Sequence, residues 1–166
     1  DFAEKIVPNS AKIIVKNADL SVDAIKQMYL RCTDKEAKFQ ALCDLYSAMN
    51  VGQSIIFVNT RKAAWELANR LKQQGNAVSL ICGTQQSGPE KIDNAMRDKV
   101  MQEFRHGVTK VLVSTDVLAR RIDVPAVTLV INYEMPLLWE EGVSYNNRQP
   151  DGHTYLHRIG RTGRFG

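Results

Sequence analysis

Three arginines stand close together at the end of the chain, in a run interrupted by two glycines between His157 and Arg164. If a helix begins at about Thr154, then Arg158, Arg161 and Arg164 follow at intervals of three residues and emerge on one side. Guanidinium is permanently charged, and its planar fork of donors matches phosphate oxygens. The spacing therefore predicts an anion-binding cluster, with a solvated basic turn as the alternative interpretation.

Further candidates lie where buried strands are predicted to end. Thr60 follows the apolar run 54–58, and Thr115 follows the run 111–114. In open α/β sheets, ligands collect at the carboxyl ends of the strands, where helix N-termini also point. The two threonines predict a phosphate-binding edge, to which Arg97 adds a third contact. The alternatives are threonines that only cap helices and an arginine that is only solvated.

A carboxylate and a histidine complete the set of candidates. Asp123 lies downstream of the run 111–114, where it is a candidate acceptor for ribose hydroxyls; the alternative is an aspartate that ends a short helix before Pro125. His157 opens the arginine run, but no serine or cysteine at a suitable spacing indicates a nucleophile with its base. We therefore do not expect nucleophilic catalysis.

Composition limits the class of protein. The 166 residues amount to one domain with a sizeable core, and a net charge of +4 permits nucleic acid binding without demanding it. Three cysteines with no C-x-x-C pair indicate free thiols in a reducing compartment, which is the cytosol or nucleus. The sequence has no long apolar segment and no signal peptide, so we expect a protein that neither spans a membrane nor is secreted.

Hydrophobic periodicity predicts an alternation of strands and helices. We expect a linker, or the tail of a preceding domain, over residues 1–24, and one α/β domain over residues 25–166. Its doubly wound, mostly parallel sheet should carry helices on both faces. Two long loops, 83–89 and 137–152, indicate function or disorder, and the second is a candidate contact surface, with a solvated loop as the alternative. The expected strands are 25–30, 54–58, 77–82, 111–114 and 127–132, and the expected helices are 35–49, 62–74, about 90–106 and the terminal one.

The three candidate segments resemble motifs of a known family. Residues 54–61, 114–123 and 157–164 are similar, in this order, to motifs IV, V and VI of the DEAD-box RNA helicases. The resemblance runs from about Ala18 to the end and implies the second, C-terminal RecA-like domain, with P-loop NTPase-type topology. Residues 25–29 and 38–46, with the long loop before Thr154, most resemble the branch of the family that exports messenger RNA at the nuclear pore.

The resemblance implies roles for the nucleotide-facing candidates. Arg161 and Arg164 match the arginine fingers that reach the γ-phosphate bound on the first domain, and Asp123 matches the residue that holds the ribose. His157 and Arg158 match positions that contact the first domain when the two lobes close. The chain contains no G-x-x-x-x-G-K-[ST] loop, so ATP with Mg²⁺ would be bound mainly by the absent N-terminal lobe, and this domain alone is expected to be inactive.

The resemblance also implies partners and a location. Thr60, Arg97 and Thr115 match contacts to the RNA backbone, which implies a single strand or short duplex of RNA bound without sequence preference. The export branch implies the N-terminal RecA-like lobe, a nucleoporin and an activator bound with inositol hexakisphosphate as partners. It further implies a monomer in the cytoplasm and at the nuclear envelope and pore, with the nucleus as the alternative.

The chain departs from the family pattern at Arg121, which stands where motif V has glycine, and at Asn94, which stands where the family has glutamine. Three other functions therefore remain open. The chain is compatible with a lobe of another superfamily-2 motor, such as a DNA translocase, and with a non-catalytic RNA-binding or adaptor module. A doubly wound domain that binds some other nucleotide is the third alternative.

Overall fold

The computed structural model describes residues 25–83, 94–115 and 124–161. The chain divides into two compact units between Val51 and Gly52. The linker predicted over residues 1–24 lies outside the described residues, so this boundary stays a prediction. None of the helices in the described ranges is long and apolar enough to cross a membrane.

The first unit contains helix α2, Lys35–Ala48, close to the helix predicted over 35–49. The Asp34 carboxylate caps it by accepting a hydrogen bond of 2.8 Å from the backbone N–H of Ala37. This bond holds the pKa of the Asp34 carboxyl below its ordinary value.

The strand predicted over residues 25–30 is wrong, since this segment forms no strand in the structure. The more buried positions do not coincide with the apolar residues, because Met28 is 47% exposed while the polar Gln27 is partly buried. Alternation shows only that one face can be buried. A strand also requires a neighbouring strand to pair its backbone, and the sequence pattern carries no information about that neighbour.

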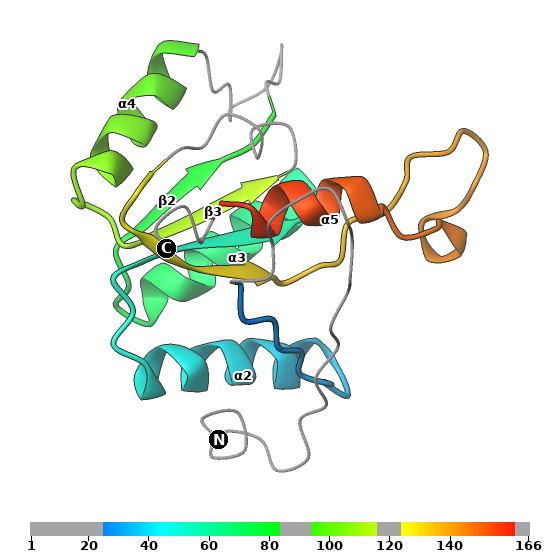
Figure 1. Ribbon diagram of the computed structural model, residues 1–166, viewed down its shortest axis with the longest axis horizontal. Coiled ribbons are helices and arrows are strands. Elements are labelled where there is room, and N and C mark those ends of the chain that lie inside the picture. Colours follow the sequence, from blue (N-terminus) through cyan, green and yellow to red (C-terminus); the bar gives the residue numbers. More distant parts are fainter. Residues whose placement is uncertain (1–24, 84–93, 116–123, 162–166) are drawn as a thin grey trace. The chain divides into compact units, whose positions relative to one another are not determined.

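The second unit holds the sheet and the remaining helices (Figure 1). Every strand and helix predicted between residues 54 and 132 is present, with the predicted bounds for the strand 127–132 and with ends shifted by one or two residues in most others. Residues 90–93 of the helix predicted over 90–106 lie outside the described part. The elements are β1 Gln53–Val58, α3 Arg61–Gln73, β2 Val78–Ile81, α4 Asn94–Arg105, β3 Val111–Thr115, β4 Val127–Asn132, the short 3-10 helix η2 Tyr145–Asn147, and α5 Gly152–Ile159.

The four described strands form a parallel sheet in the order β2-β3-β1-β4, which confirms the predicted fold class. The central strand β1 is buried along its whole length, as expected for a parallel strand covered on both faces. Val58 pairs with Thr115, and Phe57 pairs with Asn132, so the strands end at nearly the same level. The register therefore brings the segments that follow the strands to one edge of the sheet.

Helices cover both faces of this sheet. Helix α3 contacts β1, β2 and β3, and in Figure 1 it lies behind the sheet while α5 lies in front. Gly75, with a φ of +84°, follows the end of α3 in a left-handed conformation that favours glycine. It stands at the position where the sequence predicts the helix to stop.

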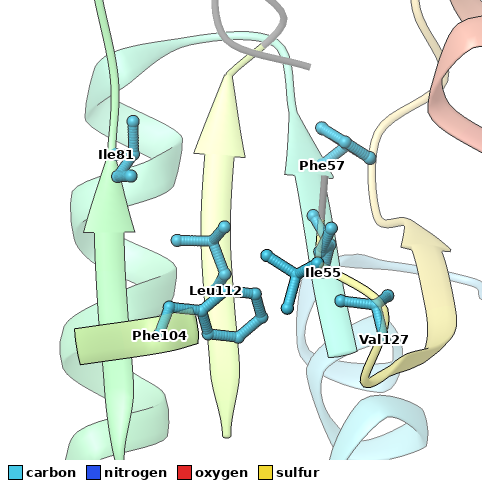
Figure 2. Close-up of a cluster of buried hydrophobic side chains, with 7 residues drawn as sticks. Ile55, Phe57, Ile81, Phe104, Leu112 and Val127 are labelled. Atoms are coloured by element: carbon cyan, nitrogen blue, oxygen red, sulfur yellow. The ribbon is translucent and has the colours of Figure 1, made fainter. Parts of the chain in front are cut away.

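The other face is packed by a cluster of apolar side chains from the strands and α4 (Figure 2). Phe104 of α4 is completely buried and lies against Leu112, with Ile55, Ile81 and Val127 around it. Because these residues come from all four strands, the cluster fixes α4 to the sheet. The cost of removing any of them includes a cavity as well as lost transfer free energy.

We expect Phe104→Ala to lower the free energy of unfolding by about 3–5 kcal/mol, because it removes a fully buried ring. Urea denaturation measures this change. Trp65→Ala, which removes an aromatic side chain that is 49% exposed, is the matched control and should cost much less. Equal losses in the two variants would contradict the packing described for α4.

Candidate functional site

Helix α5 carries the first residues of the arginine run and begins with a side-chain cap. The Asp151 carboxylate accepts hydrogen bonds from the backbone N–H of Thr154, at 3.0 Å, and from the Thr154 hydroxyl, at 2.6 Å. The hydroxyl bond, followed by the backbone bond, holds the pKa of the Asp151 carboxyl below its ordinary value of 3.8. The sequence predicts this helix from about Thr154, and it begins two residues earlier, at Gly152.

The helix ends at Ile159, so the expectation that three arginines emerge on one helical side is wrong. The backbone N–H of Gly160 donates a hydrogen bond to the Leu156 carbonyl at the end of the helix, and Arg161 lies in the following turn. Arg158 instead points into the protein and is completely buried. Arg164 lies outside the described residues. Because Arg158 is buried and Arg161 follows the end of the helix, these two arginines do not share an exposed helical face.

The Arg158 guanidinium joins three separate elements. One terminal nitrogen donates to the Asn132 side-chain oxygen at 3.0 Å and to the Glu134 carbonyl at 2.7 Å. The other donates to the Asn59 side-chain oxygen at 3.0 Å. Its central carbon lies 5.1 Å from the centroid of the Phe57 ring, which is within the range of a cation–π interaction. The guanidinium thus links α5 to the carboxyl ends of β1 and β4.

Asn59 extends this network in a second direction. Its backbone N–H donates to a Glu134 carboxylate oxygen at 2.7 Å. Its side-chain amide donates to the Met135 carbonyl and to the Tyr145 hydroxyl, both at 2.8 Å. Both the oxygen and the nitrogen of this amide therefore form hydrogen bonds. Together with the backbone bond, they hold Asn59, the residue immediately before Thr60, in place.

The candidates Thr60, Thr115 and Arg97 lie along this same edge of the sheet. Thr60 comes two residues after the end of β1, and Thr115 is the last residue of β3 and pairs with Val58. An Arg97 terminal nitrogen donates to the carbonyl of Cys82, the residue after β2, at 3.2 Å. The tertiary structure therefore brings three candidates, separated by up to 55 residues, to adjacent strand ends.

Their side chains differ in what they offer a ligand. Thr60 is exposed and caps α3, because its hydroxyl oxygen accepts from the N–H of Ala63 at 3.1 Å. A hydroxyl that accepts one bond still has its hydrogen to donate to an anion. Thr115 is only 6% exposed, so its contribution is mainly the backbone position of the strand end. Arg97 has a buried Nε with no hydrogen-bond partner within the described residues.

The two remaining described candidates lie on or just after α5. The Nε2 atom of His157 is 3.1 Å from Nε2 of His153, one helical turn earlier, with the rings edge to face. The Arg161 Nε donates to the His157 carbonyl at 3.0 Å, which holds its side chain against the end of α5. Because Arg158 contacts Asn59, this end of α5 lies at the strand edge that carries Thr60.

Part of the predicted site lies outside the described residues. Asp123, Arg164 and Arg121 fall in this category, so their roles stay predictions. Among residues 25–83, 94–115 and 124–161, no three histidine, cysteine or carboxylate side chains are grouped as metal ligands.

The polar residues that anchor Arg158 were not predicted from the sequence. Asn59, Asn132 and Glu134 each lie at or just after the end of strand β1 or β4, and that placement was the available signal. Tyr145 had no such signal, because its contact with Asn59 spans 86 residues of sequence.

Comparisons with known proteins agree with this fold. Residues 37–166 match the family model described as the helicase conserved C-terminal domain. The ATP-dependent RNA helicase DBP5 of Eremothecium gossypii is 44% identical over 166 residues, which is 100% of this chain and 33% of that protein. The chain thus spans about a third of the length of the curated relatives it matches.

Solved structures give the same result. The C-terminal domain of the DEAD-box protein Dbp5 is 46% identical, with a TM-score of 0.72 over 88% of this chain and 73% of that one. Saccharomyces cerevisiae Dbp5 bound to RNA and ADP BeF3 is 44% identical, with a TM-score of 0.76 over 99% of this chain and 39% of that one.

Two further yeast Dbp5 structures are similar to this chain. One is a C-terminal domain bound to Gle1 and IP6, at 44% identity and a TM-score of 0.71 over 84% of this chain and 71% of that one. The other is bound to Nup159, Gle1, IP6 and ADP, at 42% identity and a TM-score of 0.69 over 99% of this chain and 37% of that one.

The chain therefore belongs to the helicase conserved C-terminal domain family, as the RecA-like C-terminal domain of a DEAD-box RNA helicase. Within that family it is similar to the Dbp5 helicases along its whole length.

We expect Arg158→Met to lower the free energy of unfolding by about 1–3 kcal/mol, because it leaves the partly buried acceptors of Asn59, Asn132 and Glu134 without this donor. Urea denaturation of the 166-residue chain measures the loss. Arg105→Ala, at an exposed position in the last turn of α4, is the control and should change stability by at most about 0.5 kcal/mol. A similar, small effect in both variants would contradict a structural role for Arg158.

Asp151→Ala should destabilise the domain by about 1 kcal/mol at neutral pH, because α5 loses its cap. The folded-state pKa of Asp151 is lowered, so its stabilisation is present above 3.8 and is lost as the pH falls below that value. Urea denaturation across this pH range should show the wild type and the variant converging in acid. Asp151→Asn keeps an acceptor that does not titrate and should show a weaker dependence on pH.

Proposed function

We propose that this chain is the C-terminal lobe of an ATP-dependent RNA helicase that acts in messenger-RNA export. In this proposal it supplies arginine fingers, Arg161 and Arg164, and half of the site for the RNA backbone. The observation that carries the proposal is the alignment of Thr60, Thr115 and Arg97 at adjacent strand ends, with α5 joined to the same edge through Arg158 and Asn59. Donors from distant segments meet there, as recognition of a phosphate chain requires.

The proposed catalytic role of this lobe is electrostatic. ATP with Mg²⁺ would be bound mainly by a second, N-terminal lobe, and the isolated domain would then be inactive. The Arg161 backbone follows α5 directly, and its Nε is held by the His157 carbonyl. A guanidinium held in this way loses less side-chain freedom when it meets the γ-phosphate, where an arginine finger stabilises the charge that develops during transfer. Asp123 would hold the ribose, and His157 would contact the second lobe.

Arg158 takes a different part in this proposal from the one that its motif position implies. Its side chain has three hydrogen bonds within the lobe and is completely buried. We infer that it positions the strand edge and the end of α5, which in turn present Thr60 and Arg161. Contact of Arg158 with a second lobe stays a prediction.

The proposed RNA site uses the backbone of the nucleic acid. The Thr60 hydroxyl and the Arg97 guanidinium donate hydrogen bonds, which suit phosphate oxygens and 2′-hydroxyls, and neither side chain is arranged to read a base edge. The structure of a 44% identical Dbp5 with RNA and ADP BeF3 supports this assignment. The proposed substrate is single-stranded RNA or a short RNA duplex, bound without sequence preference.

The proposed partners and location follow from the relatives. Solved complexes of similar Dbp5 proteins with Gle1 and IP6, and with Nup159, support an activator bound with inositol hexakisphosphate and a nucleoporin as partners. A helicase with such partners would act as a monomer in the cytoplasm and at the nuclear envelope and pore, with the nucleus as the alternative.

The test is a chimera in which this chain replaces the matched part of yeast Dbp5, so that it works with a complete nucleotide-binding lobe. We expect RNA-stimulated ATP hydrolysis in the chimera and a loss of roughly 10³–10⁵ in its rate with Arg161→Ala, the range for an arginine finger. RNA affinity, measured by fluorescence anisotropy, should stay close to that of the unchanged chimera.

Arg105→Ala serves as the control and should leave both the rate and the affinity unchanged. An unaltered ATPase rate in Arg161→Ala would remove the finger assignment. Equal stimulation by DNA and RNA would favour another kind of superfamily-2 motor. RNA binding without any hydrolysis in the unchanged chimera would favour a non-catalytic adaptor module.

A further inference from the structure

A segment between β4 and α5 projects from the domain as a structured unit, which we call the 135–150 projection (orange in Figure 1). Its two ends are joined by an antiparallel bridge between Leu137 and Pro150. The backbone N–H of Leu138 donates to the Gln149 carbonyl at 2.8 Å, and the backbone N–H of Asp151 donates to the Pro136 carbonyl at 2.9 Å. This segment is therefore folded along its base.

The far part of the projection is also held by internal contacts. Gly142 turns the chain with a φ of +75°, and the N–H of Val143 donates to the Glu140 carbonyl at 3.3 Å. The short helix η2 follows, and the Nε of Arg148 donates back to the Val143 carbonyl at 3.4 Å. A surface that is already ordered loses less conformational entropy on binding than a flexible loop does.

The Arg158 network anchors the projection to the sheet edge. The Asn59 side-chain nitrogen donates hydrogen bonds to both the Met135 carbonyl and the Tyr145 hydroxyl, so both residues are attached to Asn59. The projection is thus continuous with the edge that presents Thr60, and it stands in a fixed relation to it.

The projection exposes several large apolar side chains within a short segment. Trp139 is 73% exposed and Met135 is 53% exposed, and Leu138 and Tyr145 are exposed as well. Isolated exposed apolar side chains are common, but four on one folded segment indicate a binding surface. Tryptophan and tyrosine are also the residues that most often dominate the energetics of protein interfaces.

Charge decides which kind of partner fits this surface. Glu140 and Glu141 follow Trp139 directly and are exposed, whereas Arg148, the only basic residue of the projection, is partly buried against the Val143 carbonyl. The accessible charge beside the tryptophan is therefore negative, on a chain whose net charge is +4. Carboxylates repel the phosphates of RNA, although an exposed tryptophan alone would suit base stacking.

We propose that the 135–150 projection is a docking surface for a protein segment that presents an apolar side chain next to lysine or arginine. The apolar side chain packs on Trp139 and Leu138, while the basic residues pair with Glu140 and Glu141. This binding site is separate from the proposed RNA and nucleotide contacts and goes beyond the proposed function.

The test is a selection of short random peptides, displayed on phage, against the 166-residue chain. Enriched peptides, synthesised with a fluorophore, should combine aliphatic or aromatic residues with lysine or arginine. Trp139→Ala should weaken their binding by about tenfold or more, as expected for an interface hot spot. Glu140→Lys combined with Glu141→Lys should weaken it at low salt, with a smaller difference at high salt, because exposed charges are screened.

Trp65→Ala is the matched control, since it removes the tryptophan of α3, which is 49% exposed, and should leave peptide binding unchanged. Thermal unfolding should show that each variant stays folded. No enriched peptide, enriched peptides that are acidic, or binding insensitive to Trp139→Ala would overturn the proposal. Binding of a uridine oligonucleotide that depends on Trp139 would instead identify RNA as the partner. Self-association that is lost in Trp139→Ala would identify a second copy of the chain as the partner.

Discussion

The site depends on one buried cation. Arg158 is completely buried, although arginine is rarely found inside a protein, and burial of a charge costs several kcal/mol unless its hydrogen bonds are made. Three acceptors from Asn59, Asn132 and Glu134 and the face of Phe57 provide this compensation. Because these partners lie at the ends of two strands, the guanidinium is stable only when α5 and the sheet edge are correctly joined. The hydrogen bonds that offset the burial of Arg158 therefore also hold the elements of the site together.

Two arginines of the terminal run, Arg158 and Arg161, consequently have different roles. Arg158 points inward and fixes geometry, whereas Arg161 follows the end of the helix and is held by the His157 carbonyl. The division arises because the helix stops at Ile159, so residues three apart in sequence do not share a helical face. A rigid edge next to a cationic turn fits the proposed closure of two lobes on a ligand, since a rigid edge loses less entropy on binding.

Much of the fold was predictable from local patterns. The buried runs of β1 and β3, the amphipathic α3 and the threonine cap at residue 60 are each specified by a few neighbouring residues, and all are present. Residues 25–30 show the limit, because their alternation indicated a strand, yet pairing depends on a neighbour that a local pattern does not contain. The inward direction of Arg158 was likewise missed, since it depends on acceptors up to 99 residues away.

The sequence by itself determined the strands and helices between residues 54 and 132, the parallel sheet and the family, because hydrophobic periodicity and short motifs are local properties of the chain. Only the tertiary structure decided that Thr60, Thr115 and Arg97 share an edge, and that Asn59 ties this edge to Arg158 and Tyr145. The physical reason is that strand register and side-chain burial follow from contacts between distant segments, and the free energy of each contact exists only when both partners are in place.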